Sequence, residues 1–176
     1  IYIKQISYLL NLLGININTV PNLDLRRKFS HKIIGDRSFS SNSKVVSVIG
    51  DLCIKLFNNN GISCVIKHIA GHGLAKVDSH NFTPNINKSI EYLNNKDFFT
   101  FKNKKTFFAM TAHIVFNKID NKNPVTHSKK MIKLIRNKIG FKNLIISDDL
   151  SMKSLKGSIS ENTIKTFNSG CNIVLH

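Results

Sequence analysis

The chain has 176 residues, of which 41% are apolar, 9% aromatic and 20% charged. This length supports one packed core, and the apolar content excludes a disordered tail. The 26 Lys and Arg against 10 Asp and Glu give a formal charge of +16, which points to nucleic acid or an anionic membrane as partners. However, 22 of the cations are Lys, and the chain also has 22 Asn and 24 Ile, all residues with A/T-rich codons. Base-composition drift therefore accounts for the charge without such a partner.

The sequence has no feature of a membrane or secreted protein. No apolar run reaches the roughly 20 residues that cross a bilayer, and no basic segment with an apolar block and a cleavage site begins the chain. We therefore expect a soluble, cytoplasmic protein. Its cysteines, Cys53, Cys64 and Cys171, are odd in number and lack C-x-x-C spacing, so we expect buried thiols.

The first third of the chain reads as helix, strand and helix. Apolar residues at helical spacing predict a helix over Ile3 to Leu13, which Gly14 ends. A strand-like run follows from Ile15 to Leu25. The turn-rich segment Gly35 to Ser40 precedes a second helix, for which Ser43 is the predicted N-cap.

The same alternation continues to the end of the chain. The predicted strands are Ser63 to Lys67, Thr106 to Met110, Leu144 to Ile146 and Asn172 to Leu175, and the predicted helices are Lys88 to Asn95, Ser128 to Ile139 and Glu161 to Phe167. Short apolar strands joined by helices indicate parallel pairing, in an open sheet or a (β/α)₈ barrel. Because no Gly-rich dinucleotide turn or P-loop is present, we expect an α/β fold that is a partial (β/α)₈ barrel, with residues 1–176 as a single domain.

Polar residues follow the predicted strands, where both architectures place their sites. They are Asp24, Lys67, His68, His113, Asp148 and Asp149. Side chains alternate in direction along an extended segment, so of two adjacent aspartates one faces the barrel mouth. We expect Asp148 to be that residue. The alternative is an aspartate that caps the next helix.

The segment from Lys67 to His80 contains three histidines and several glycines. Asp78 lies two residues before His80 and could accept a hydrogen bond from its Nδ1, which would leave Nε2 facing a substrate. A histidine held in this way, opposite a carboxylate, forms an acid/base and nucleophile pair.

Two other functions use features of the same sequence. A metal-dependent barrel hydrolase could bind zinc through His68, His72, His113 and Asp148, although the usual His-x-His pair is absent. A basic nucleic-acid-binding module could use Lys102-Asn103-Lys104-Lys105 with Phe101, Phe107 and Phe108. Its lysines are scattered along the chain and arginine is scarce, which is atypical of such modules.

Four linked motifs resemble a known family in both order and spacing. They are Ile34-Gly35-Asp36-Arg37-Ser38-Phe39, then Lys67-His68-Ile69-Ala70-Gly71-His72-Gly73 with Asp78-Ser79-His80, then Met110-Thr111-Ala112-His113, and Ser147-Asp148-Asp149-Leu150-Ser151-Met152. They are similar to blocks of the bacterial β-N-acetylglucosaminidases of glycoside hydrolase family three, cytoplasmic enzymes of peptidoglycan recycling.

The resemblance implies a retaining hydrolase without a cofactor or metal. Its substrate partner would be an amino sugar, the non-reducing N-acetylglucosamine of muropeptide fragments that contain anhydro-N-acetylmuramic acid, and no nucleic acid or membrane partner is implied. Asp148 falls at the nucleophile that forms a covalent glycosyl-enzyme, and His80 at the acid/base, with Asp78 as its partner. The residues at sugar-binding positions are Arg37, Lys67 and His68. A complete enzyme of this kind would be a monomer.

The chain departs from the family pattern in two ways. It has Ile69-Ala70 where the family usually has Phe-Pro. The family's N-terminal strands, with an aspartate that grips the sugar, would lie before Ile1, and its C-terminal tail would follow His176. The length is about 70 residues below the roughly 250 of a typical barrel, so we expect unpaired sheet edges, low solubility and impaired activity.

Overall fold

A computed structural model describes residues 1–29 and 32–176 of the chain. Its α-helices are α1 Tyr2–Leu12, α2 Ser43–Asn58, α3 Ile90–Asn95, α4 Lys129–Leu134 and α5 Ile159–Ser169. Its strands are β1 Ile17–Asn18, β2 Ser63–Ile69, β3 Asn85–Ile86, β4 Phe108–Thr111, β5 Val115–Phe116, β6 Leu144–Asp149 and β7 Ile173–Leu175. Its short helical turns are η1 Gly35–Arg37, η2 Phe98–Phe101, η3 Val125–His127 and the π-helical η4 Ile135–Ile139.

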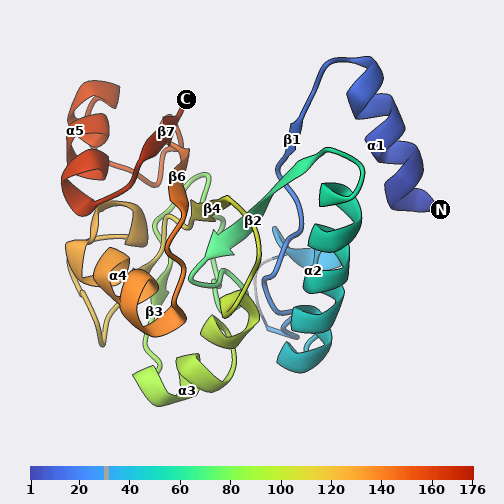
Figure 1. The fold of residues 1–176 in the computed structure, drawn as a ribbon. Helices are drawn as coiled ribbons and strands as arrows, with labels where there is room; N and C mark the ends of the chain where they lie inside the picture. The colour runs from blue at the N-terminus through green and yellow to red at the C-terminus, as the bar shows by residue number, and fades with distance from the viewer. Residues whose placement is uncertain (30–31) are drawn as a thin grey trace.

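The centre of the fold is a parallel five-stranded sheet in the order β1-β2-β4-β6-β7. Its strands follow one another in chain order, so each crossover adds the next strand on the same side (Figure 1). The sheet is curved, and α2, α4 and α5 lie outside it (Figure 1). Since all pairs are parallel, the carboxyl ends of the strands lie along one edge. The predicted parallel α/β architecture is confirmed, as a curved five-stranded sheet rather than a closed barrel.

The start of helix α2 and its buried face both follow from the local sequence. Its N-cap is Asn42, whose side-chain oxygen accepts hydrogen bonds from the second and third backbone N–H groups beyond it. The prediction of Ser43 as the N-cap is therefore wrong, because Ser43 already lies in the first turn. Val46, Ile54 and Phe57 recur at helical spacing and are buried against the sheet.

The first strand is much shorter than predicted. Only Ile17 and Asn18 form β1, where Ile15 to Leu25 was expected. The chain nevertheless continues beside β2, since the Leu23 N–H donates to the Lys67 carbonyl and the Lys67 N–H donates to the Pro21 carbonyl. Proline has no N–H to donate, so the ladder is interrupted at Pro21. This segment carries Asp24 to the carboxyl edge of β2.

Two further features of the strands differ from the sequence prediction. The parallel pair β3–β5 was not predicted, because a two-residue strand carries no measurable periodicity. Strand β6 continues through Asp149 rather than ending at Ile146, so Asp148 and Asp149 lie within the strand. The pairing of β6 with β7 shifts register between Ile146 and Asp149, so the surroundings of each aspartate decide which way it faces.

The core lies between the sheet and the surrounding helices. Its fully buried members include Ile66 of β2, Phe98 of η2, Met131 of α4 and Ile145 of β6. Cys64 and Cys171 are buried and Cys53 is partly buried, all as free thiols. None of the described helices is long and apolar enough to cross a membrane.

A substitution in β2 tests the packing of this core. Replacing Ile66 by Ala should lower the free energy of unfolding by about 2–5 kcal/mol, since the side chain is fully buried and the neighbours cannot fill the space. Ile164→Ala makes the same change on α5 at a side chain that is 58% exposed, and should cost less than about 0.5 kcal/mol. Urea denaturation measures both, and equal losses would contradict this packing.

Candidate active site

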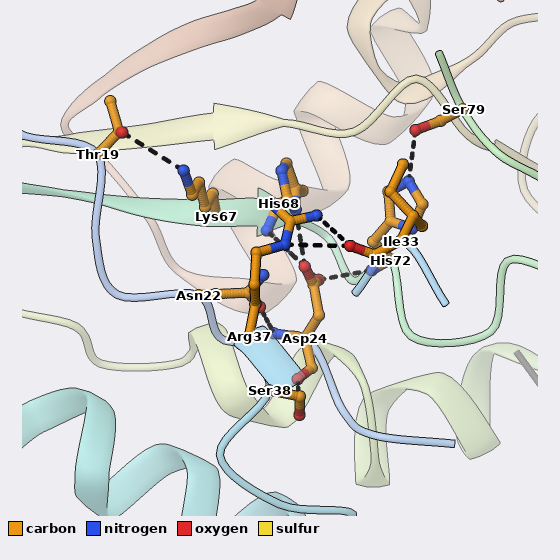
Figure 2. A network of polar contacts seen from close by, with 10 residues as sticks. All are labelled: Thr19, Asn22, Asp24, Ile33, Arg37, Ser38, Lys67, His68, His72 and Ser79. Carbon is orange, nitrogen blue, oxygen red and sulfur yellow. Dashed lines mark hydrogen bonds and ion pairs between the residues drawn. The ribbon is translucent and has the colours of Figure 1, made fainter. Parts of the chain in front are cut away.

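The carboxyl edge of the sheet is organised around the buried carboxylate of Asp24 (Figure 2). Its Oδ2 lies 2.7 Å from His68 Nδ1, and the His68 backbone N–H lies 3.3 Å from both oxygens. Its Oδ1 accepts a hydrogen bond of 2.6 Å from the backbone N–H of His72. One side chain thus holds the end of β2 and the loop that follows it.

Asp24 is ionised despite its burial. Burial by itself raises the pKa of this carboxyl, but the charge and hydrogen bond of His68, together with His72, outweigh it and hold the pKa below its ordinary value. Because a carboxylate can only accept, His68 Nδ1 must carry the proton that it shares with Asp24. The Nε2 of His68 is the ring nitrogen that remains for another partner.

Lys67, Arg37 and Asp148 form the charged part of the site. Burial and the positive charge of Arg37 lower the pKa of the Lys67 ammonium, while the negative charges of Asp148 and Asp24 raise it. The Lys67 Nζ also lies 3.4 Å from the hydroxyl of Thr19. The Arg37 guanidinium donates to the Ile33 carbonyl from Nε, at 3.1 Å, and from a terminal nitrogen, at 2.5 Å (Figure 2).

The two adjacent aspartates of β6 have different surroundings. Asp148 lies near enough to Lys67, His72 and His113 for its charge to raise the pKa of each. Asp149 accepts hydrogen bonds of 2.8 Å from both the N–H and the hydroxyl of Ser151, which lower its pKa. The charge of Asp149 also acts on His113, but its carboxylate is engaged by Ser151, whereas the charge of Asp148 reaches Lys67 and His72 as well.

His113, which follows β4, connects this part of the chain to the end of β6. Its Nε2 lies 2.9 Å from the carbonyl of Asp149, and its Nδ1 lies 2.7 Å from the hydroxyl of Thr126. A carbonyl only accepts, so Nε2 carries the proton and Nδ1 accepts from Thr126. Burial lowers the pKa of the His113 ring, although Asp148 opposes this shift. His113 is thus an uncharged side chain that hydrogen bonds to the end of β6.

His72 connects the Asp24 cluster to the next segment of the loop. Its Nε2 lies 2.8 Å from the hydroxyl of Ser79, and both residues are buried (Figure 2). Burial and the nearby His68 lower the pKa of His72 to about 4. At neutral pH the ring is therefore uncharged.

Asp78 and His80 lie in the same loop, between β2 and β3. The His80 Nδ1 and its backbone N–H each lie 2.8 Å from Asp78 Oδ1. The His80 side chain is 62% exposed, and no hydrogen bond or ion pair of the described residues joins it to Asp148. The structure thus brings Arg37, Lys67, His68 and Asp148 to one edge of the sheet, whereas Asp78 and His80 pair with each other in the loop after β2.

Two sets of contacts near the site were not predicted from the sequence. Asp24 was noted at a strand end, but its role as the anchor of His68 and His72 was not predicted. Arg27 pairs with buried Asp97 at 2.9 Å, and burial raises the pKa of Asp97 to about 6. These two residues are 70 positions apart and belong to no motif, so the sequence carries no signal for their contact.

The structure also describes the residues of the two alternative sites, the zinc site and the nucleic-acid-binding stretch. Within residues 1–29 and 32–176, no three His, Cys, Asp or Glu side chains are grouped so that they could hold a metal ion. In the lysine-rich stretch, Phe101 is buried and the Lys104 ammonium is tied to Ser47 and Asp51. These two side chains are therefore not available to a nucleic acid.

The pH dependence of stability tests the environment of His72. The unfolded chain takes up a proton near pH 6.5, whereas folded His72 does so only near pH 4, so acidification across this window favours unfolding. This residue should remove about 3 kcal/mol of stability between these pH values. The curve for His72→Gln, which cannot titrate, should be flatter by that amount in urea denaturation. Parallel curves would contradict a desolvated ring.

Comparisons with known proteins identify the family. The model of the "Glycosyl hydrolase family 3 N terminal domain" matches residues 4–176. Beta-hexosaminidase A from Pseudoalteromonas piscicida is 33% identical over 184 residues, which cover 94% of this chain and 31% of that protein.

Solved structures agree with the sequence matches. A glycoside hydrolase family 3 β-N-acetylglucosaminidase from Paenibacillus sp. superposes with a TM-score of 0.93 at 27% identity, covering 98% of this chain and 34% of that one. NagZ from Neisseria gonorrhoeae, in complex with N-trifluoroacetyl-D-glucosamine, gives 0.85 at 31% identity, covering 96% and 49%. NagZ has also been solved in complex with a zinc ion. The chain spans half or less of these relatives, and it belongs to glycosyl hydrolase family 3, within the N-terminal domain of that family.

Proposed function

We propose that this chain contributes the active site of a retaining β-N-acetylglucosaminidase that acts on peptidoglycan fragments. The observation that carries the proposal is the position of Asp148, beside Lys67 and the Asp24–His68 pair at the carboxyl edge of the sheet. The names of the relatives, and the amino-sugar ligand of NagZ, support a hexosamine substrate. Muropeptide fragments, in the cytoplasm, are the specific substrates that we propose.

The fold supports this assignment if the curved sheet is part of a barrel. We propose that residues 1–176 form a single domain and that its five strands are a portion of a (β/α)₈ barrel, closed by further strands beyond the chain at β1 and β7. Such a closed catalytic unit would act as a monomer. In a barrel of this kind the carboxyl ends of all strands surround one cleft.

The proposed chemistry proceeds in two displacements. The Asp148 carboxylate attacks the anomeric carbon, and the bond to the leaving oxygen breaks as His80 donates the proton of its Nε2 to that oxygen. His80 then takes a proton from water, whose oxygen attacks the same carbon and displaces Asp148. Two inversions give net retention. The hydrogen bond from Nδ1 to Asp78 keeps the His80 ring in the required orientation.

The remaining polar groups suit the binding of a sugar. His68 donates from Nδ1 to Asp24, so its Nε2 can accept a hydrogen bond from a sugar hydroxyl. The Lys67 ammonium and the Arg37 guanidinium can only donate, which fits hydroxyl and N-acetyl oxygens. The pairing of one acceptor with two cationic donors would fix the orientation of the sugar above Asp148.

The role of Asp148 is tested by comparing it with its neighbour. Asp148→Asn keeps the shape of the side chain but removes the nucleophile, so turnover of an aryl N-acetylglucosaminide should fall by about a thousandfold or more. Asp149→Asn is the matched control, because its carboxylate faces Ser151, and it should retain most of the rate. Equal losses in the two variants would contradict the assignment.

Chelators provide the control for a metal-dependent reaction. If Asp148 acts as a nucleophile, EDTA should leave the parent rate unchanged. Loss of activity with EDTA, restored by added zinc, would instead favour the metal-dependent hydrolase.

A further inference from the structure

A second cavity, distinct from the site at Asp24, opens between three loops. Its volume is about 370 Å³, and it is lined from the start of β3, the segment 121–127, the segment 154–156 and α5. Thr83 and Ser154 both line it, and the Thr83 hydroxyl donates to the Ser154 carbonyl. We call this space the lysine cavity.

The wall of the lysine cavity carries positive charge only. Lys122, Lys156 and Lys165 line it, and no Asp or Glu is among the described residues of the wall. An adjoining hollow of about 400 Å³ shares Lys165 and adds Lys129 and Lys130, together with the carboxylate of Asp120. Ammonium groups only donate hydrogen bonds, so these side chains favour an acceptor with negative charge.

Two buried polar atoms of the wall lack a partner. The Ser154 side chain is 4% exposed, and its Oγ makes no hydrogen bond among the described residues. The same holds for His127 Nε2, which is also buried. Buried polar atoms are normally paired, so unpaired atoms on one cavity wall favour the binding of a polar ligand there. The Ser154 hydroxyl can donate to it.

His127 lies close to the charge of Lys165. Burial, with the charges of His113 and Lys165, lowers the pKa of the His127 ring to about 4. The ring is therefore neutral at pH 7 and adds a hydrogen-bonding group rather than a fourth charge. Lys165 itself lines the cavity from α5.

The nearest carboxylates are already engaged. Asp120 accepts from the N–H groups of Lys122 and Asn123, at 3.1 and 3.2 Å, and from the Ser128 hydroxyl at 2.7 Å. Glu161 interacts with Lys165 through charge, but it is fully exposed and its Oε2 lies 2.8 Å from the Ser158 N–H. Neither carboxylate fills the cavity.

We propose that the lysine cavity binds a small molecule through an oxyanion group, either a phosphate or a carboxylate. The three ammonium groups would balance its charge, and the Ser154 hydroxyl would donate to one of its oxygens. The volume lies within the range of small-molecule sites. The proposal does not depend on the glycosidase assignment, since it uses none of the residues around Asp148.

The experiment is a titration of the ¹⁵N-labelled chain with inorganic phosphate, followed by amide chemical shifts at a constant ionic strength of about 0.1 M. Saturable shifts should be confined to residues 121–127 and 154–156. A parallel titration with acetate distinguishes the two sources of the oxyanion. If both ions shift the same amides, the site accepts either a carboxylate or a phosphate. If only phosphate shifts them, the ligand group is a phosphate.

Two variants with equal charge provide the decisive comparison. Lys156→Gln with Lys165→Gln should weaken phosphate binding by about tenfold or more, the effect of losing a charge-assisted hydrogen bond. Lys44→Gln with Lys142→Gln removes the same charge from exposed positions elsewhere and should leave the affinity unchanged. Ser154→Ala should also weaken binding. The proposal would be overturned if both lysine pairs weakened phosphate binding equally. It would also be overturned if the shifts were spread over the surface, or if neither anion caused any shift.

Discussion

The site depends on the buried carboxylate of Asp24. Removing such an ion from water costs several kcal/mol, and the cost is offset only when its oxygens are fully hydrogen bonded. Asp24 meets this condition through the ring and N–H of His68 and the N–H of His72. Because these three donors belong to β2 and the loop after it, the need to satisfy one anion fixes the backbone from which Lys67 and His68 extend.

Specific hydrogen bonds connect the Asp24 cluster to the proposed acid/base, and others hold the end of β6. His72 hydrogen bonds to Ser79, which lies between the paired Asp78 and His80. On the other side of the site, His113 braces the end of β6 through the Asp149 carbonyl. The proposed acid/base is thus tied to the Asp24 cluster, whereas the proposed nucleophile is held by β4 and β6. The relative position of the two groups depends on the packing of β2 against β4.

The sequence allowed the local elements to be predicted, because their signals are local. Apolar spacing predicted α2, and Gly140, with a φ of 88°, ended the helical segment as expected. The alternation along β6 predicted that Asp148 and Asp149 face opposite ways. The contact of Arg27 with Asp97 and the pair β3–β5 were beyond this reasoning, since each joins distant segments through tertiary packing without a periodic pattern. Asp24 was placed at the correct edge, but its partners depend on the conformation of the loop at His72.

The most direct test of this account is the free energy of unfolding of Asp24→Asn, measured in urea at pH 7. The amide keeps the shape but cannot accept all of the hydrogen bonds from His68 and His72, so stability should fall by about 3–5 kcal/mol. Asp36→Asn removes an exposed carboxylate that pairs with Arg26, and should cost less than about 1 kcal/mol. A loss for Asp24→Asn no larger than that of Asp36→Asn would show that the buried carboxylate does not hold the site together.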